Sequence, residues 1–154
     1  MIGDVLRERR LTLAAAESCT GGLVSHLITN VPGASDYFLG GVVSYSNTIK
    51  QDLLGVKAET LDRFGAVSAE TVLEMAGGAR RRLGADIAVA VTGIAGPGGA
   101  TADKPVGLTF IGVCDQSGQT ARRFLWDADR ETNKRYSAQA ALEFLLEYLT
   151  RSAP

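Results

Sequence analysis

The sequence predicts a three-layer α/β/α sandwich in which helices cover both faces of a mixed sheet. Helical and strand-like patterns alternate along the first half of the chain, which is typical of parallel strands joined by helices. Residues 86–92 form a continuous apolar run, as in strands buried on both faces. Residues 106–114 and 120–126 are strand-like and flank the turn sequence DQSGQ, which predicts a hairpin. We therefore expect a parallel core with an antiparallel edge hairpin.

The first predicted elements are a helix, a strand, a tight turn and a second helix. Residues 2–10 are amphipathic, and the apolar run 11–16 has the length of a strand. The polar and glycine-rich segment 17–22 predicts the turn, and residues 23–29 return to helical spacing. Residues 37–45 are rich in β-forming types, and their Gly-Gly pair indicates a bulge or a close backbone approach.

Capping residues define the later helices. Ser46 or Asn47 can cap a helix that a glycine ends after residue 54. A shorter helix is predicted over residues 58–63, and the clearest one, over 68–83, begins at a serine and stops at a glycine. Residues 130–149 predict a final amphipathic helix.

Composition narrows the class of protein. The chain has 154 residues, of which 45% are hydrophobic and 21% charged, and its formal net charge is −1. We expect a single domain over residues 1–154, a length that supports its own core. Balanced charge predicts no nucleic-acid partner, and the lack of a long apolar stretch predicts no membrane partner. Two cysteines without metal-ligand spacing fit a cytoplasmic protein without a bound metal, and the apolar helices are compatible with a homo-oligomer.

Glycine accounts for 18 of the 154 residues and gathers at the ends of predicted elements. In open α/β sheets, ligands bind at the carboxyl ends of strands, where such turns lead into helices. The segments 18–22 and 93–99 both have this position. We therefore expect the two turns to face one pocket.

Ser18 is the candidate nucleophile. It lies at the exit of a buried strand, directly before Thr20, Gly21 and Gly22. Unpaired backbone N–H groups at a helix start can stabilise an oxyanion, so a serine here could attack a carbonyl carbon. The alternative is that Ser18 or Thr20 only caps the helix.

The residue that would activate this serine is harder to identify. His26, the only histidine, lies about two helical turns further on, which disfavours Ser-His-Asp catalysis, and Glu17 is interpreted as a solvated turn carboxylate. Lys50 could act as the base if burial lowers its pKa. A helix start near residue 46 would place Lys50 one turn along, and Tyr45 would point into the same region. A solvated lysine beside a core tyrosine is the alternative.

The second glycine-rich segment could bring its backbone close to a ligand. Its candidate contacts are Thr92, Gly93, Ile94, Ala95 and Gly96. It lacks the lysine and hydroxyl of a P-loop, no GxGxxG motif follows a strand, and a simple connector is the alternative. Arg130, at the start of the last helix, could bind a phosphate, although charged residues there are more often solvated.

Four motifs occur in a fixed order along nearly the whole chain. They are AESCTGG at 16–22, YSN at 45–47 with Lys50, GAVS at 65–68, and TGIAGPGG at 92–99 followed by KPVG at 104–107. In these motifs the chain resembles the C-terminal domain of the CinA family, whose stand-alone versions are similar to nicotinamide-nucleotide amidases. The resemblance implies hydrolysis of the carboxamide of nicotinamide mononucleotide to nicotinate mononucleotide and ammonia, without a cofactor.

Carried over by position, the resemblance implies that Ser18 is the nucleophile and that Lys50 and Tyr45 assist it. Asn47, in the second motif, joins the candidate substrate contacts. We expect no coupled pyrophosphatase activity, because the molybdopterin-binding type of domain that longer family members carry is not in this sequence. Two other functions stay open: a non-catalytic nucleotide-sensing or assembly module, and a competence factor that binds nucleic acid, which would need a basic face.

Overall fold

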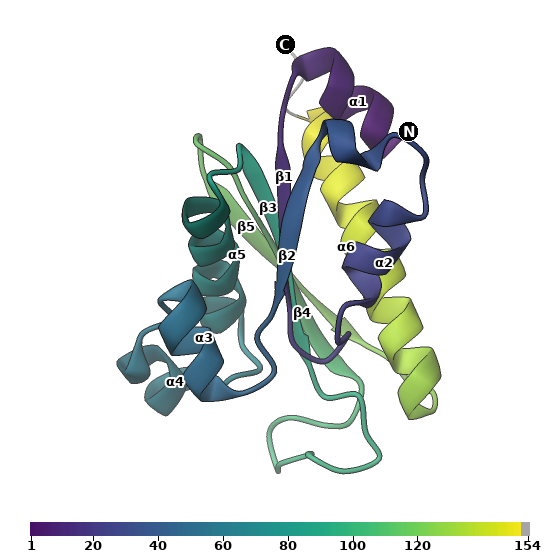
Figure 1. Ribbon diagram of the computed structural model, residues 1–154. Helices are drawn as coiled ribbons and strands as arrows, with labels where there is room; N and C mark the ends of the chain where they lie inside the picture. The colour runs from purple at the N-terminus through teal and green to yellow at the C-terminus, as the bar shows by residue number, and fades with distance from the viewer. Residues whose placement is uncertain (152–154) are drawn as a thin grey trace.

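A computed structural model describes residues 1–151 as a five-stranded sheet between two layers of helices (Figure 1). Residues 152–154 of the predicted domain lie outside the described residues. The helices are α1 (Ile2–Arg9), α2 (Leu23–Thr29), α3 (Asn47–Leu54), α4 (Ala58–Phe64), α5 (Ala69–Leu83) and α6 (Arg130–Arg151), with a short 3-10 helix at Ala34–Asp36. The strands are β1 (Leu13–Glu17), β2 (Phe38–Val43), β3 (Ile87–Gly93), β4 (Leu108–Cys114) and β5 (Gln119–Leu125).

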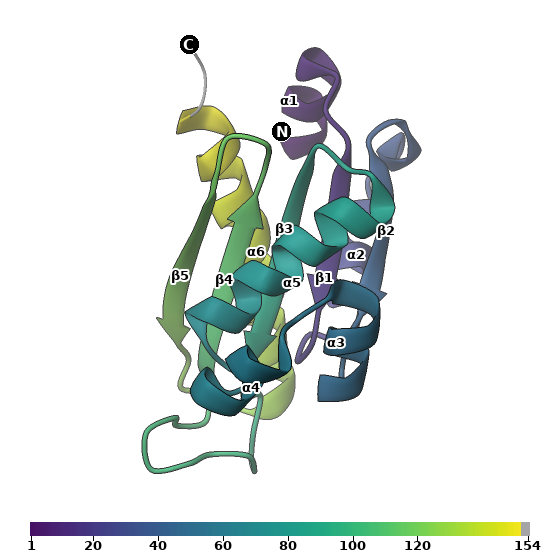
Figure 2. The ribbon, with the colours of Figure 1, turned by 90° about the vertical axis from the view of Figure 1, so that its left-hand side faces the viewer.

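The sheet has a parallel half and an antiparallel half. Its strand order is β2-β1-β3-β4-β5. Strand β1 pairs in parallel with both β2 and β3, whereas β4 runs antiparallel to β3 and β5 antiparallel to β4. Figure 2 shows the β4–β5 hairpin at one side of the sheet. The predicted parallel core and edge hairpin are confirmed.

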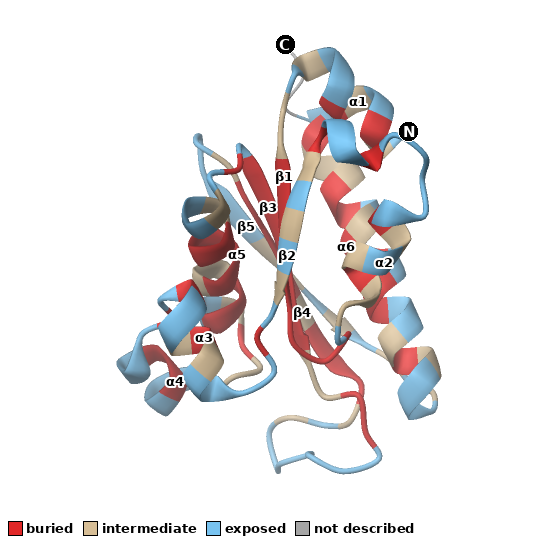
Figure 3. Ribbon diagram, viewed as in Figure 1, coloured by how far each residue is buried: buried red, intermediate tan, exposed pale blue. Residues whose placement is uncertain are grey.

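Helices cover both faces of the sheet, as predicted. Helices α1, α2 and α6 lie on one side and α3, α4 and α5 on the other (Figures 1 and 2). Along β1, Leu13 and Ala15 belong to one hydrophobic cluster and Ala14 and Ala16 to the other. Successive side chains of a strand point to opposite faces, so this small-residue strand serves two cores. Figure 3 shows the resulting burial of the central strands.

Local capping chemistry sets the helix ends. The Ser46 hydroxyl caps α3 by accepting from the Ile49 N–H at 3.2 Å, and the Ser68 hydroxyl caps α5 by accepting from the Thr71 N–H at 3.1 Å. Strand β1 begins two residues later than predicted, because the Leu11 N–H is still bonded to the Leu6 carbonyl of α1. Helix α5 approaches α3 closely, since a methyl group at Gly78 would collide with the Leu54 carbonyl.

The fold brings three turns to one edge. The carboxyl ends of β1, β2 and β3 coincide because these strands are parallel neighbours, and they point downward in Figure 1. The segment joining β3 to β4 extends below the same edge. Within residues 1–151, no helix combines the length and the apolar character that crossing a membrane would require.

Candidate active site

A serine and a lysine meet at this edge. The Nζ atom of Lys50 donates a hydrogen bond to the Oγ atom of Ser18 at 3.1 Å. Ser18 follows β1, and its backbone N–H donates to the Val91 carbonyl of β3 at 3.0 Å, which holds the turn against the sheet. Lys50 lies in the second turn of α3, the helix that follows β2. The two side chains meet because β1 and β2 are parallel neighbours.

The amine of Lys50 is buried without a counter-ion. Its side chain is 1% exposed, and Nζ also donates to the carbonyls of Ser44 at 2.7 Å and Tyr45 at 3.3 Å. Among residues 1–151, no carboxylate forms an ion pair with it. Burial lowers the pKa of Lys50. When the amine is neutral, its two N–H groups can go to the two carbonyls, and the contact with Ser18 then reverses, so that the Ser18 hydroxyl donates to the nitrogen lone pair.

The neighbouring thiol is buried in a way that disfavours its thiolate form. Cys19 lines the same cavity, but burial raises its pKa to about 12. A thiol attacks as its thiolate, which this environment suppresses. Ser18 therefore stays the candidate nucleophile of the turn.

Glu17 is not the solvated carboxylate that the sequence suggested. Its side chain is 1% exposed and accepts four hydrogen bonds, from the Thr20 hydroxyl at 2.6 Å, the Val24 N–H at 2.8 Å, and the Ser25 N–H at 3.0 Å and hydroxyl at 2.8 Å. The residue that caps α2 is Gly22, which has no side chain to fulfil this task. The Glu17 carboxylate therefore accepts from the N–H groups at the start of α2 that a capping side chain would otherwise bind, and its negative charge is favourable at a helix start.

Replacing Glu17 by glutamine should destabilise the fold by about 3 kcal/mol, since the new amide group would face N–H and O–H donors. Chemical denaturation with a fluorescence readout would measure this difference. The matched control is Glu59→Gln, which changes an exposed glutamate of α4 and should shift the free energy of unfolding by no more than about 0.5 kcal/mol. Equal losses in the two variants would contradict this role of Glu17.

A cavity of about 270 Å³ opens at the serine–lysine pair. Of the predicted site residues, the cavity is lined by Ser18, Tyr45, Asn47, Lys50, Thr92, Gly93, Ile94, Ala95, Gly96 and Arg130. Cys19, Gly98 and Gly99 also line it and lie within the two turns that were expected to face one pocket, whereas the prediction missed Ala66 and Val67. The Thr92 hydroxyl donates to the Ala66 carbonyl at 2.8 Å and so ties this wall to β3. The GAVS motif was the available signal for Ala66 and Val67.

Three predicted residues lie elsewhere. Thr20, Gly21 and Gly22 line a neighbouring cavity with His26 and Lys134. The turn curves away after Cys19 because the Thr20 side chain is held by Glu17. The first glycine-bearing turn thus contributes Ser18 and Cys19 to the serine–lysine cavity, and not its glycines.

Tyr45 lies at the rim and not between the serine and the lysine. Its side chain is 62% exposed, which also excludes the core tyrosine considered as an alternative. Its hydroxyl accepts from Arg130 Nη2 at 3.1 Å, and Arg130 Nη1 donates to the Gly96 carbonyl at 2.7 Å. Contact with Lys50 comes from the Tyr45 backbone carbonyl. Assistance to Ser18 through the Tyr45 hydroxyl therefore has no support in these contacts, and Arg130 bridges two walls of the cavity.

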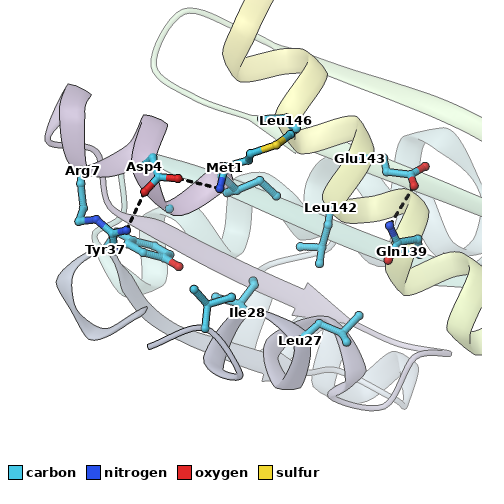
Figure 4. Close-up of a pocket in the computed structure, with 13 residues that line it drawn as sticks. Met1, Asp4, Arg7, Leu27, Ile28, Tyr37, Gln139, Leu142, Glu143 and Leu146 are labelled. Carbon is cyan, nitrogen blue, oxygen red and sulfur yellow. Dashed lines mark hydrogen bonds and ion pairs between the residues drawn. The ribbon is translucent and has the colours of Figure 1, made fainter. Parts of the chain in front are cut away.

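A larger cavity of about 470 Å³ lies between α1, α2 and α6 (Figure 4). Figure 4 shows the apolar side chains of Leu27, Ile28 and Leu142 beside polar ones that pair with one another, as Asp4 does with Arg7. No serine, cysteine or lysine lines it in the described part of the chain. In residues 1–151, no three His, Cys, Asp or Glu side chains gather as metal ligands. The serine–lysine cavity is thus the candidate active site.

Fold and site together define an α/β domain with a serine–lysine pair at the carboxyl edge of its parallel strands. The family profile for the CinA C-terminal domain matches residues 1–149. The chain belongs to this family.

Known relatives agree with this assignment. A CinA-like protein of Thermotoga neapolitana is 52% identical over 145 residues, which are 94% of this chain and 35% of that protein. A CinA-like protein of Leptospira borgpetersenii is 46% identical over 150 residues, 97% of this chain and 36% of that protein. This chain therefore spans about a third of the length of these curated relatives.

Solved structures share the fold. The competence damage-inducible protein A of Klebsiella pneumoniae superposes with a TM-score of 0.95 at 34% identity, covering 99% of this chain and 94% of that one. The competence/damage inducible protein CihA of Agrobacterium tumefaciens gives a TM-score of 0.91 at 43% identity, covering 97% and 90%.

Proposed function

We propose that this chain is a nicotinamide-nucleotide amidase, which hydrolyses the carboxamide of nicotinamide mononucleotide to nicotinate mononucleotide and ammonia. The observation that carries the proposal is the contact between Ser18 and a buried Lys50 that has a lowered pKa and no carboxylate partner. A serine with a lysine base suits acyl transfer from an amide. The resemblance of the four motifs to the family's amidases supplies the substrate.

In the first half of the reaction, Ser18 Oγ attacks the carboxamide carbon while Lys50 Nζ accepts the hydroxyl proton. The new C–O bond turns the carbonyl oxygen into an oxyanion, which backbone N–H groups of the Gly93–Gly96 turn stabilise. Lys50 then gives its proton to the amide nitrogen. The C–N bond breaks, ammonia leaves, and the nicotinoyl group with its ribose phosphate remains as an ester on Ser18.

Water completes the reaction. Lys50 accepts a proton from the attacking water, whose oxygen bonds to the ester carbon. The Ser18 C–O bond then breaks, and the proton returns from Lys50 to Ser18 Oγ. One water is consumed and one ammonia released, and the enzyme regains its starting state.

The cavity walls suit the two ends of a nucleotide. Ala66, Val67 and Ile94 offer an apolar surface for a pyridine ring near Ser18. Arg130 lies at the rim, and two of its five N–H donors account for its contacts with Gly96 and Tyr45. The remaining donors can bind the phosphate, which would stay near solvent.

The direct test is ammonia release from nicotinamide mononucleotide by the purified chain, together with calorimetry of the same ligand. Turnover that follows enzyme concentration supports the amidase. Binding without ammonia release would contradict it and favour the non-catalytic nucleotide-binding module. An electrophoretic shift of DNA would favour the competence factor instead.

The pH dependence of kcat should report the ionisation of Lys50. Only the neutral amine accepts the serine proton, so kcat should rise with pH and level off above an apparent pKa lower than the ordinary lysine value of about 10.4. Steady-state rates between about pH 6 and about pH 10 would trace this limb. A profile that falls as pH rises would contradict lysine as the base.

A further inference from the structure

A buried asparagine of α6 holds the second glycine-rich turn. Asn133 is 2% exposed, and its Nδ2 donates to the carbonyl of Ala95 at 3.0 Å and to that of Ala128 at 3.0 Å. Ala95 belongs to the cavity lining, whereas Ala128 lies just before the helix. Both hydrogens of the amide are thus used to join α6 to its surroundings.

The other half of this amide is unsatisfied. Asn133 Oδ1 is buried and has no hydrogen-bond partner among the described residues. An unpaired buried acceptor costs stability, and an apolar side chain at this position would avoid that cost. The asparagine is therefore better explained by what its two donors position than by a gain in stability.

The contact fixes the orientation of one peptide plane. In a trans peptide the carbonyl and the next N–H point in opposite directions. The Ala95 carbonyl points to Asn133 in α6, so the Gly96 N–H points away from that helix. Within residues 1–151, this N–H donates to no acceptor, and Gly96 lines the serine–lysine cavity.

Neighbouring contacts reinforce the same arrangement. Arg130, three residues before Asn133 on α6, holds the next carbonyl, that of Gly96. Gly96 has φ of 86°, and a methyl group there would collide with the Val106 side chain. The turn therefore passes too close to Val106 for any residue larger than glycine, and two α6 side chains set its direction.

We propose that Asn133 is a positioning residue, which aims the Gly96 N–H into the cavity as a donor to the oxyanion of the amidase reaction. The inference rests on the proposed function and adds a residue to it. Asn133 itself touches neither the serine–lysine pair nor the cavity lumen. It acts through the Ala95–Gly96 peptide.

Asn133→Ala and Asn133→Asp test this role, because both remove the two donors. We expect kcat to fall by about 10²-fold with KM changed by less than about twofold, since the donor acts mainly on the transition state. The matched control is Ser137→Ala, one turn along α6, whose hydroxyl accepts from Trp126 Nε1 and donates to the Asn133 carbonyl. This control should keep kcat within about threefold while lowering the melting temperature.

A ligand-free readout separates the inference from the proposed reaction. The Gly96 backbone ¹⁵N resonance reports the hydrogen bond to the Ala95 carbonyl and should move in both Asn133 variants but not in Ser137→Ala. An unmoved resonance, or equal loss of kcat in the Asn133 and Ser137 variants, would overturn the inference while leaving the amidase intact. A wild-type chain without ammonia release would overturn the amidase and, with it, the oxyanion role.

Discussion

Replacing Ser18 by alanine should abolish ammonia release from nicotinamide mononucleotide, with a loss of at least about 10³-fold in kcat. The variant removes the Oγ atom that forms the ester while the Lys50 amine keeps its contacts with the Ser44 and Tyr45 carbonyls. Because Ser18 is anchored through its backbone N–H, alanine should occupy the same turn. A coupled ammonia assay on purified protein would measure the loss.

A second serine-to-alanine variant serves as a control that separates loss of the reaction from loss of the folded structure. Ser117 lies in the β4–β5 turn, at the edge of the sheet opposite the cavity, and Ser117→Ala should keep full activity. Both variants should melt within a few degrees of the parent chain. If Ser18→Ala kept kcat within tenfold of the parent, an ester on Ser18 would be excluded, and direct attack by water beside Lys50 would replace it.

Replacing Lys50 by methionine should lower kcat by about 10²- to 10⁴-fold, the usual contribution of a general base. Methionine is apolar and fills most of the lysine volume, so the cavity wall should persist. Lys50→Arg should not restore the rate, since a guanidinium stays charged and accepts no proton near neutral pH. Steady-state kinetics of both variants against the parent would measure the effect, and activity retained in Lys50→Met would exclude the lysine as base.

The same substitution should change how stability depends on pH. The folded-state pKa of Lys50 is lowered by burial, so the unfolded chain binds more protons between that value and the unfolded lysine value of about 10.4. The free energy of unfolding contributed by Lys50 therefore increases with pH across this window and is smallest below it. Lys50→Met should lack this rise in denaturation series, and an identical slope in both proteins would contradict the lowered pKa.

Hydrophobic periodicity and capping residues were sufficient to predict the fold, because both place the ends of the helices and strands at the same positions. The apolar run that became β3 and the hairpin turn before β5 defined the two halves of the sheet. Parallel order also explains why Ser18 and Lys50 could be placed in one region from sequence alone, since strand ends of parallel neighbours share an edge. Their actual contact at 3.1 Å confirms that juxtaposition, while their catalytic roles stay predictions.

Side-chain direction in irregular segments could not be predicted. Thr20 and Tyr45 lie in the turns that follow strands, so no period of two or 3.6 sets which way they point. Glu17 was predicted to lie in a turn because the strand was expected to end at residue 16, whereas β1 includes Glu17. Glu17 turned inward to cap α2, and it took the Thr20 hydroxyl with it. Asn133 could have been noticed in the sequence, because it is a polar residue on the same buried face of α6 as Ala140 and Phe144. Its spacing alone does not predict which carbonyl groups its side chain contacts.

The sheet order has a consequence for how the site comes into being. Ser18, Lys50, the turn at Gly96 and its α6 contacts span most of the chain, and they converge only when β1 has found both of its neighbours and α6 has docked. Such long-range pairings form late, because the loops between them must close first. The serine–lysine cavity should thus be completed in the last step of folding, so that partly folded chains hold Ser18 and Lys50 apart.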